Sequence, residues 1–420
     1  MSSFILFGVV LILAFGYTFF LNDRNISLSK LFFITLLVMH GPAFIYYELN
    51  EYGLTTVGSR GANILSIVFI GTILGHSLFH GLRKGNKQYK IKSYKVWNES
   101  KWIIKSFNVS LLLFFVLLSY IIIIGGLFFQ NGITALWSVA TMNLSPELIK
   151  EIRLNESGVS GWLKSPFLYL TNGFGRFIAF LFFAYVVTEK KSIIFKIASY
   201  TLIFLLLLSC ATDITKSNAL IFLVQFVFLI LLIRGVTISL KKQVIFFLIF
   251  LGLIIPIYFL LTVIDNVNVA LEEIVFRFTN EPNRVFHEYI SYWPDFEGFK
   301  YGMNIRQIHS LLSNEKFIPA AQILSGGIGN WNVMFAGDAW VDFGYLGVII
   351  TSVLVGFYLN LMDSYCFKEK SIFQVSLFAA LIYPAINLVS NSLQTNFFLY
   401  GLLSFPAIAF LLKIRLKKAV

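Results

Sequence analysis

Residues 106–129 read SFNVSLLLFFVLLSYIIIIGGLFF, and this stretch decides the fold. It is almost entirely apolar, and about 20 apolar helical residues are enough to cross the ~30 Å hydrocarbon core of a bilayer. A strand of a membrane barrel would instead alternate polar and apolar residues over about ten positions. The stretch therefore predicts a transmembrane α-helix.

Windows of the same kind recur along the whole chain. They fall at 3–21, 31–48, 62–82, 106–129, 166–187, 197–212, 218–234, 243–264, 336–361, 372–392 and 395–413. The composition agrees, because 57% of the residues are hydrophobic and only 13% are charged, whereas soluble domains carry about 25% charged residues. We therefore expect an all-α, polytopic transmembrane helical bundle of about 11 spans, forming a single domain over residues 1–420.

Charge patterning predicts the topology. The loop at 83–105 holds eight Lys and Arg against one acid, so the positive-inside rule places it in the cytoplasm. Alternation then gives an N-out, C-in chain with two long segments outside, 130–165 and 265–335. On this topology most of the basic residues lie in cytoplasmic segments, which accounts for the net charge of +12, and a nucleic-acid partner is not expected.

The sequence contains none of the common cofactor motifs. There is no Walker motif, GxGxxG, HExxH, GxSxG, DxD or metal-spaced Cys/His cluster, and Cys210 and Cys366 lie on different predicted spans. We therefore expect no cofactor and no metal. The ionisable residues concentrate instead in the 265–335 loop and at the outer ends of spans.

Within that loop, FRFTNEPNRVFHEYI carries a pattern suited to binding phosphate. Arg277 and Arg284 are seven residues apart, about two helical turns, and His287 follows one turn later. Guanidinium groups match phosphate oxygens with paired donors, so this face is suited to a diphosphate. An equally weighted reading pairs the arginines with nearby glutamates or lipid headgroups, and Pro282 disfavours a continuous helix.

Further along, two more pairs could carry chemistry. Arg306 and His309 are one turn apart, and a neighbouring cation favours the neutral, basic form of an imidazole. Asp338 and Asp342 are four residues apart, which puts both carboxylates on one helix face. They are candidates for a general base, for hydrogen bonding to sugar or for pairing with loop arginines. The alternatives are a loop histidine without function for His309 and a helix N-cap for Asp338.

Three isolated cations complete the set of candidates. Arg60 and Lys216 fall at outer span ends, where snorkelling is the alternative reading. Arg176 lies inside the fifth span, where a charge requires a polar partner. His40, inside the second span, is read as structural or as lining a cavity.

The stretch GDAWVDFGYLGVII, residues 337–350, resembles the opening of a late span in the bacterial oligosaccharide repeat-unit polymerases, the Wzy-type O-antigen and capsule polymerases. A long, Arg-rich outer loop precedes it, as in that family. In many relatives an arginine in a GSR stretch stands where this chain has Lys216, and GSR occurs here earlier, at residues 58–60. This departure leaves the roles of both positions open.

The resemblance implies a GT-C-like fold and a metal-independent, inverting membrane glycosyltransferase. It would move a growing glycan from undecaprenyl diphosphate onto another lipid-linked repeat unit, in the bacterial cytoplasmic (inner) membrane with its site on the periplasmic side. Besides lipid-linked oligosaccharides and membrane lipids, the implied partners are a chain-length regulator and a flippase. The diphosphate would be bound by Arg277, Arg284, Arg306, Arg60, Arg176 and Lys216. The proton would be accepted by one of Asp338, Asp342, His309 and His287.

Two other functions are compatible with the sequence. An O-antigen ligase uses the same donor but transfers the glycan to a lipid A core. A transporter of polysaccharide or lipid-linked sugar would carry more charges in mid-span and internal repeat symmetry, and we find no convincing repeat.

Overall fold

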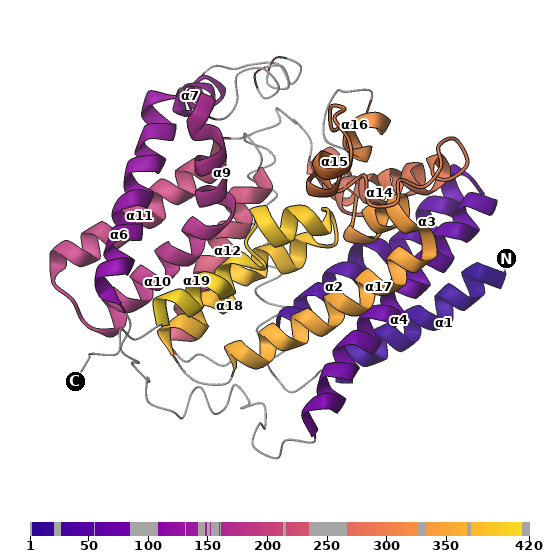
Figure 1. The fold of residues 1–420 in the computed structure, drawn as a ribbon, viewed down its shortest axis with the longest axis horizontal. Helices are drawn as coiled ribbons and strands as arrows, with labels where there is room; N and C mark the ends of the chain where they lie inside the picture. The colour runs from indigo at the N-terminus through magenta and orange to yellow at the C-terminus, as the bar shows by residue number, and fades with distance from the viewer. Residues whose placement is uncertain are drawn as a thin grey trace. The chain divides into compact units, whose positions relative to one another are not determined.

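The computed structural model is helical throughout the part of the chain that it describes (Figure 1). That part consists of residues 2–20, 27–53, 55–84, 108–130, 132–141, 148, 152, 159, 161–212, 216–234, 267–325, 333–367 and 371–413. Within it there are helices and no strands. The prediction of an all-α fold is therefore confirmed.

Several helices have the length and composition of membrane spans. Among the described residues five qualify: Leu28–Glu51, Thr56–Phe79, Val109–Phe129, Ile193–Ala211 and Phe335–Cys366. A sixth qualifies if the pair Gly161–Asn172 and Phe174–Thr188, bent by 49°, is one broken span. These helices support a membrane protein. The predicted span 243–264, residues 85–105 of the basic loop and part of 130–165 lie outside the described residues, so the count of 11 and the topology remain predictions.

The chain divides into two compact units. Unit 1 contains residues 1–91, 266–364 and 385–396, and unit 2 contains 92–265, 365–384 and 397–420. The helices of unit 1 are α1 (Ser2–Phe20), α2 (Leu28–His40), α3 (Pro42–Glu51), α4 (Thr56–Lys84), α14 (Val267–Tyr292), α15 (Arg306–Leu312), α16 (Ala320–Leu324) and most of α17 (Phe335–Cys366).

The second predicted span is two helices. Pro42 has no N–H to donate and occupies the first turn of α3, where its fixed φ is accommodated, so α2 ends at His40 and Gly41 separates the two helices. At its other end, α2 is capped by a carboxylate from α17. Asp363 accepts hydrogen bonds from Leu28 N at 2.7 Å and from Ser29 N at 3.0 Å, which satisfies free N–H groups at a helix start.

Small residues allow α4 and α17 to pack with their backbones in contact. A Cβ at Gly75 would lie 2.0 Å from Val353 O, and a Cβ at Gly356 would lie 2.0 Å from Thr72 O. Gly71, four residues before Gly75, faces Ser352, four residues before Gly356. This is the small-xxx-small pattern of helix pairs in membranes, in which close approach compensates for the lack of a hydrophobic driving force.

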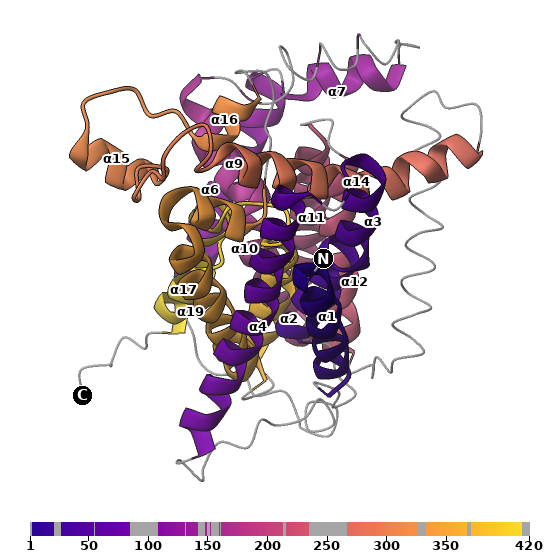
Figure 2. The ribbon, with the colours of Figure 1, turned by 90° about the vertical axis from the view of Figure 1, so that its right-hand side faces the viewer.

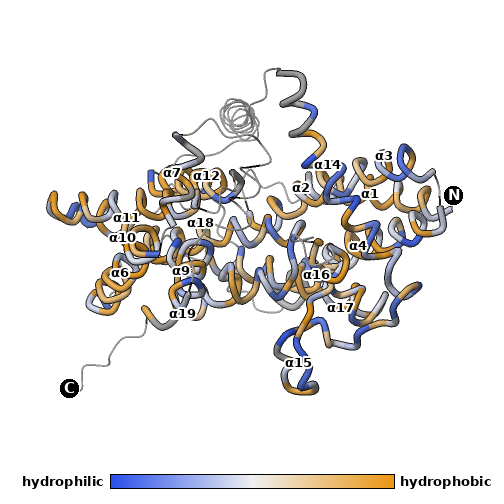
Figure 3. Tube along the Cα trace, turned by 90° about the horizontal axis from the view of Figure 1, so that it is seen from above, coloured by the Kyte–Doolittle hydropathy of each residue, from blue (hydrophilic) through white to orange (hydrophobic). Residues whose placement is uncertain are grey.

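The predicted loop 265–335 is largely ordered and begins with a long helix. α14 is 26 residues long, continues through Pro282, and lies across the ends of α2, α3 and α4 (Figure 2). Hydrophilic residues gather on the segment that carries α15 (Figure 3). The polar part of unit 1 therefore lies at one end of its helices.

At that end, α17 is broken within its first ten residues. Gly344 has φ 59° and ψ −143°, a conformation that glycine adopts without a steric penalty. The break frees two carbonyl groups from their helical partners, and a neighbouring turn supplies donors instead. Val341 O accepts from Lys300 N and Asp342 O accepts from Tyr301 N, both at 2.9 Å.

Unit 2 is arranged around α10. Its helices are α6 (Val109–Ile124) with a π-turn η1 (Gly125–Phe129), α7 (Gly132–Thr141), η2 (Gly161–Leu163), α9 (Lys164–Asn172), α10 (Phe174–Thr188), α11 (Ile193–Ala211), α12 (Lys216–Ile233), most of α18 (Ile372–Asn387), and α19 (Ser404–Lys413). A second π-turn, η3 (Thr395–Leu399), holds residues of both units. Every residue of α10 from Phe174 to Val186 is buried, as expected for a helix that is apolar all round.

Candidate functional site

The two acids of the GDAWVDFGYLG stretch have different surroundings. Asp342 is buried, and its Oδ1 accepts hydrogen bonds from Gly302 N at 3.1 Å and from Asn304 N at 3.0 Å. This carboxylate therefore holds the turn at 300–305 against α17. Its role in the structure is to fix a loop, which the spacing alone did not indicate.

Asp338 uses only one of its two carboxylate oxygens in hydrogen bonds with the described residues. Its Oδ1 accepts from Asn304 Nδ2 at 3.1 Å, and Asn304 Oδ1 in turn accepts from Ala320 N at 2.9 Å. No described residue donates to the other carboxylate oxygen, and the residue is half-buried. The N-cap reading is wrong, because α17 begins at Phe335; Asp338 lies in the first turn, where the helix dipole favours its charge.

α14 lies next to this acid. Burial, and secondarily the charge of Asp338, raises the pKa of Tyr289 above its ordinary value, so the phenol stays protonated. Tyr289 is a buried residue of α14. α14, which carries the candidate arginines, therefore lies close to the Asp338 carboxylate.

His287 has a buried carboxylate partner that the sequence analysis missed. Its Nδ1 lies 2.6 Å from Oε1 of Glu48, which is fully buried, and its ring stacks on Tyr52 at 4.0 Å. No described residue hydrogen-bonds Nε2. A carboxylate at Nδ1 orients an imidazole and favours the neutral tautomer with its proton on Nδ1, which leaves the lone pair on Nε2. The signal in the sequence was a lone acid within the apolar window 31–48.

Gly58 makes room for this pair. A Cβ at Gly58 would lie 2.3 Å from Oε2 of Glu48, and that oxygen is buried with no hydrogen-bond partner. The glycine of the GSR stretch therefore accommodates a carboxylate in the structure.

Arg277 and Arg284 both lie on α14 and are exposed. Their seven-residue spacing puts them on one face, because the helix continues through Pro282. Another side of α14 is fixed by the buried Asn283, whose Oδ1 lies 2.8 Å from Nδ1 of His40. His40 also contacts Val389 O at 3.1 Å through Nε2 and is 1% exposed, so it is a structural residue packed in the unit.

The other loop pair belongs to a separate short helix. Arg306 and His309 lie on the seven-residue α15, where Arg306 is exposed and His309 packs edge-on against Phe317 at 5.4 Å. Within the described residues neither forms an ion pair with an acid. In that part of the chain, His309 has no partner that would activate it as a base.

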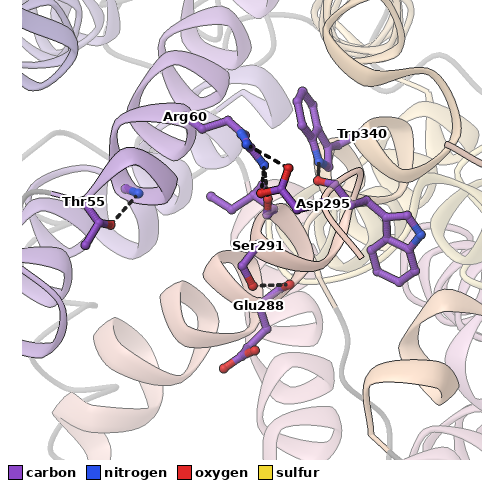
Figure 4. Close-up of polar contacts among 9 residues, drawn as sticks. Thr55, Arg60, Glu288, Ser291, Asp295 and Trp340 are labelled. Carbon is purple, nitrogen blue, oxygen red and sulfur yellow. Dashed lines mark hydrogen bonds and ion pairs between the residues drawn. The ribbon is translucent and has the colours of Figure 1, made fainter. Parts of the chain in front are cut away.

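Arg60 is bound to an acid of its own unit. Its guanidinium holds both oxygens of Asp295, at 3.0 and 3.1 Å, and donates to Ile290 O at 2.8 Å (Figure 4). These bonds fasten the start of α4 to the end of α14. Trp340 in α17 reaches the same turn through a 2.9 Å hydrogen bond to Trp293 O.

This geometry predicts that Arg60 and Asp295 act as a pair. Arg60→Gln and Asp295→Asn are expected to reduce thermal stability by similar small amounts, about 1 kcal/mol, because the pair is partly exposed. Thermal unfolding in detergent of both single variants and of the double variant measures this. A much larger loss of activity in Arg60→Gln than in Asp295→Asn would contradict the pairing role and favour phosphate binding by Arg60.

Arg176 lies in unit 2 and has the polar partners that its position requires. It is fully buried at the break between α9 and α10. Nε donates to Thr171 O at 2.7 Å, Nη1 donates to Gln225 Oε1 at 2.9 Å, and the guanidinium lies 4.3 Å from the ring centroid of Tyr383. Arg176 therefore satisfies a carbonyl group that the broken span leaves free.

Gln225 extends this network to a second kink. Pro384 in α18 cannot donate to Ala380 O, and Gln225 Nε2 donates to that oxygen instead at 2.8 Å. Arg176 thus has a structural role in the folding of unit 2. Lys216 begins α12, and its side chain lies outside the described part of the structure.

No group of three or more metal-ligating side chains occurs among the described residues. Comparisons of the chain with protein-family models, with curated proteins and with solved structures found no match. The candidate site therefore consists of residues of unit 1. They are Asp338, with one carboxylate oxygen bound by Asn304, the His287–Glu48 pair, and the exposed Arg277 and Arg284 of α14.

Proposed function

We propose that the protein is a membrane glycosyltransferase that polymerises lipid-linked oligosaccharide repeat units. The observation that supports this most strongly is Asp338, a carboxylate at the polar end of a membrane helix, with one oxygen held by Asn304 and the other without a donor among the described residues. In the reaction, an acceptor sugar hydroxyl attacks the anomeric carbon of the donor glycan. The bond from that carbon to undecaprenyl diphosphate breaks with inversion, and the base takes the hydroxyl proton.

The arginines of α14 would bind the leaving group. Arg277 and Arg284 are exposed on a helix that lies across the ends of α2, α3 and α4, a placement suited to lipid phosphates at a membrane surface. Charge that develops on the diphosphate would be stabilised there. The polyprenyl diphosphate is already activated, so neither nucleotide nor metal is required.

Two residues are candidates for the base. Asp338 has a carboxylate oxygen without a donor among the described residues, and His287 has a carboxylate partner that orients its ring. Asp342 holds the loop and is the weaker candidate. We assign the base to Asp338 and keep His287 as the second candidate.

The wider proposal places the enzyme in the bacterial inner membrane. It has about 11 spans, a GT-C-like arrangement, an N-out and C-in topology, and its site on the periplasmic side. A flippase would supply its substrate and a chain-length regulator would modulate its product.

Deletion of the gene, followed by a gel of surface polysaccharide, tests the function. Caps of a single repeat unit are the expected result. Loss of all attached polymer with free lipid-linked chains would identify a ligase instead, and repeat units retained on the cytoplasmic side would identify a transporter. Either of these results would overturn the polymerase assignment.

Complementation of the deletion with variants tests the residues. Asp338→Asn is expected to lower polymerisation by about 10²-fold or more, the size of a lost general base. Asp342→Asn should lose less than about tenfold, because an amide oxygen can still accept the Gly302 and Asn304 N–H groups. Arg277→Ala and Arg284→Ala should each shorten the ladder while the protein still inserts. Full activity of Asp338→Asn would transfer the role to His287.

A further inference from the structure

Tyr301 has a backbone conformation that is rare for its residue type and an exposed side chain. Its φ is 50°, in the left-handed region of the backbone that residues other than Gly, Asn and Asp rarely adopt. The residue is 73% exposed, and among the described residues its side chain has no hydrogen-bond partner and no ring pair. A glycine would satisfy the backbone better, so the fold does not account for an aromatic residue here.

The strained conformation is fixed by α17. Lys300 N and Tyr301 N donate to the carbonyls freed by the Gly344 break, and Gly302 N donates to the Asp342 carboxylate. Hydrogen bonds before, at and after the strained position therefore hold one backbone geometry. A strained backbone conformation persists only where the surrounding contacts enforce it, and such positions cluster at functional sites.

The fixed backbone of Tyr301 favours a polar ligand over lipid. Tyr301 follows Lys300, whose Nζ pairs with Glu297 at 3.2 Å, in a segment where charged residues and glycines alternate with aromatic residues such as the exposed Phe296. An aromatic anchor at a membrane surface needs no fixed backbone, whereas a binding surface gains from a rigid tyrosine that offers contact area at low entropic cost. A sugar ring fits this surface, because it has an apolar C–H face for the aromatic ring and hydroxyl groups for polar neighbours.

We propose that Tyr301 is a stacking surface for a sugar ring of the acceptor repeat unit, an inference that rests on the proposed polymerase function. The acceptor is assigned because Asp342, which holds this turn, lies one helical turn from Asp338, the proposed base toward the acceptor hydroxyl. Tyr301 is thus a specificity-determining residue for the glycan.

The test compares variants that separate ring, hydroxyl and backbone. Tyr301→Gly removes the ring and relieves the positive φ, and Tyr301→Phe keeps the ring. Purified protein is assayed with the lipid-linked single repeat unit extracted from the deletion strain. Tyr301→Gly is expected to raise KM for this acceptor roughly three- to tenfold, the size of one aromatic contact, with kcat little changed. Its thermal stability should equal or exceed that of the wild type.

Tyr301→Phe should stay within about twofold of the wild type. Phe296→Ala is the matched control, because Phe296 is an aromatic residue of the same segment, 80% exposed, and has no assigned role; a wild-type KM is expected. An unchanged KM in Tyr301→Gly, a Tyr301→Phe variant as weak as Tyr301→Gly, or a fall in stability in Tyr301→Gly would each overturn the proposal. If the wild type itself turns over no repeat units, the polymerase function fails as well, and this outcome differs from a selective effect at Tyr301.

Discussion

Gly356→Val is expected to abolish recovery of folded protein. A Cβ at this position would lie 2.0 Å from Thr72 O and 2.8 Å from Thr72 C, so the new atoms meet backbone that no side-chain rotation can move aside. Overpacking typically costs 1–3 kcal/mol, and a backbone clash between two helices should reach or exceed about 3 kcal/mol. Fluorescence-detected size-exclusion chromatography in detergent should show loss of the monodisperse peak.

The chain supplies a matched control for this variant. Gly8 and Gly16 are also helical glycines, in α1, and nothing lies within 4 Å of a Cβ built at either. Gly8→Val and Gly16→Val should therefore elute like the wild type. Equal recovery of Gly356→Val and Gly8→Val would contradict the close contact of α4 with α17.

Arg176→Met is expected to destabilise unit 2 by about 2–6 kcal/mol, because it leaves two buried acceptors without donors at about 1–3 kcal/mol each. Methionine fills similar space but leaves Thr171 O and the Gln225 amide oxygen without their donors. Arg176→Lys should also be destabilising, because one ammonium group cannot reproduce the planar fork. Thermal unfolding in detergent measures both variants.

A double-mutant cycle with Gln225→Leu gives the control. The two residues share a 2.9 Å hydrogen bond, so their effects should not add, and the coupling should be at least about 1 kcal/mol. Additive losses would contradict the network. A stable Arg176→Met protein without polymerase activity would instead support a role for Arg176 in diphosphate binding.

Local sequence patterns anticipated the parts of the fold that depend on neighbouring residues. Within the described ranges the long apolar runs are helices, the spacing of Arg277 and Arg284 puts them on one exposed face of α14, and Asp338 and Asp342 share one helix. Breaks within spans were less visible. Gly41 with Pro42 divides one predicted span, and Gly344 bends another, although both carry glycine or proline as a signal.

Pairings between distant segments could not be derived from spacing. Glu48 and His287 are 239 positions apart, and Arg60 and Asp295 are 235 apart, so each pair exists only because α14 lies across the ends of earlier helices. The same holds for the two roles of the paired acids. Whether a carboxylate holds a turn or keeps an open oxygen depends on Gly302 and Asn304, which belong to a loop with no regular period.

The glycine contact between α4 and α17 also bears on how the protein is made. Gly75 precedes Gly356 by 281 positions in the sequence, and chains grow at roughly 5–20 residues per second. After synthesis, α4 is therefore without its partner for roughly 15–55 s. During that time its glycine surface is open to other small-residue helices, including copies of α4 in neighbouring chains, and a slower ribosome would lengthen this competition.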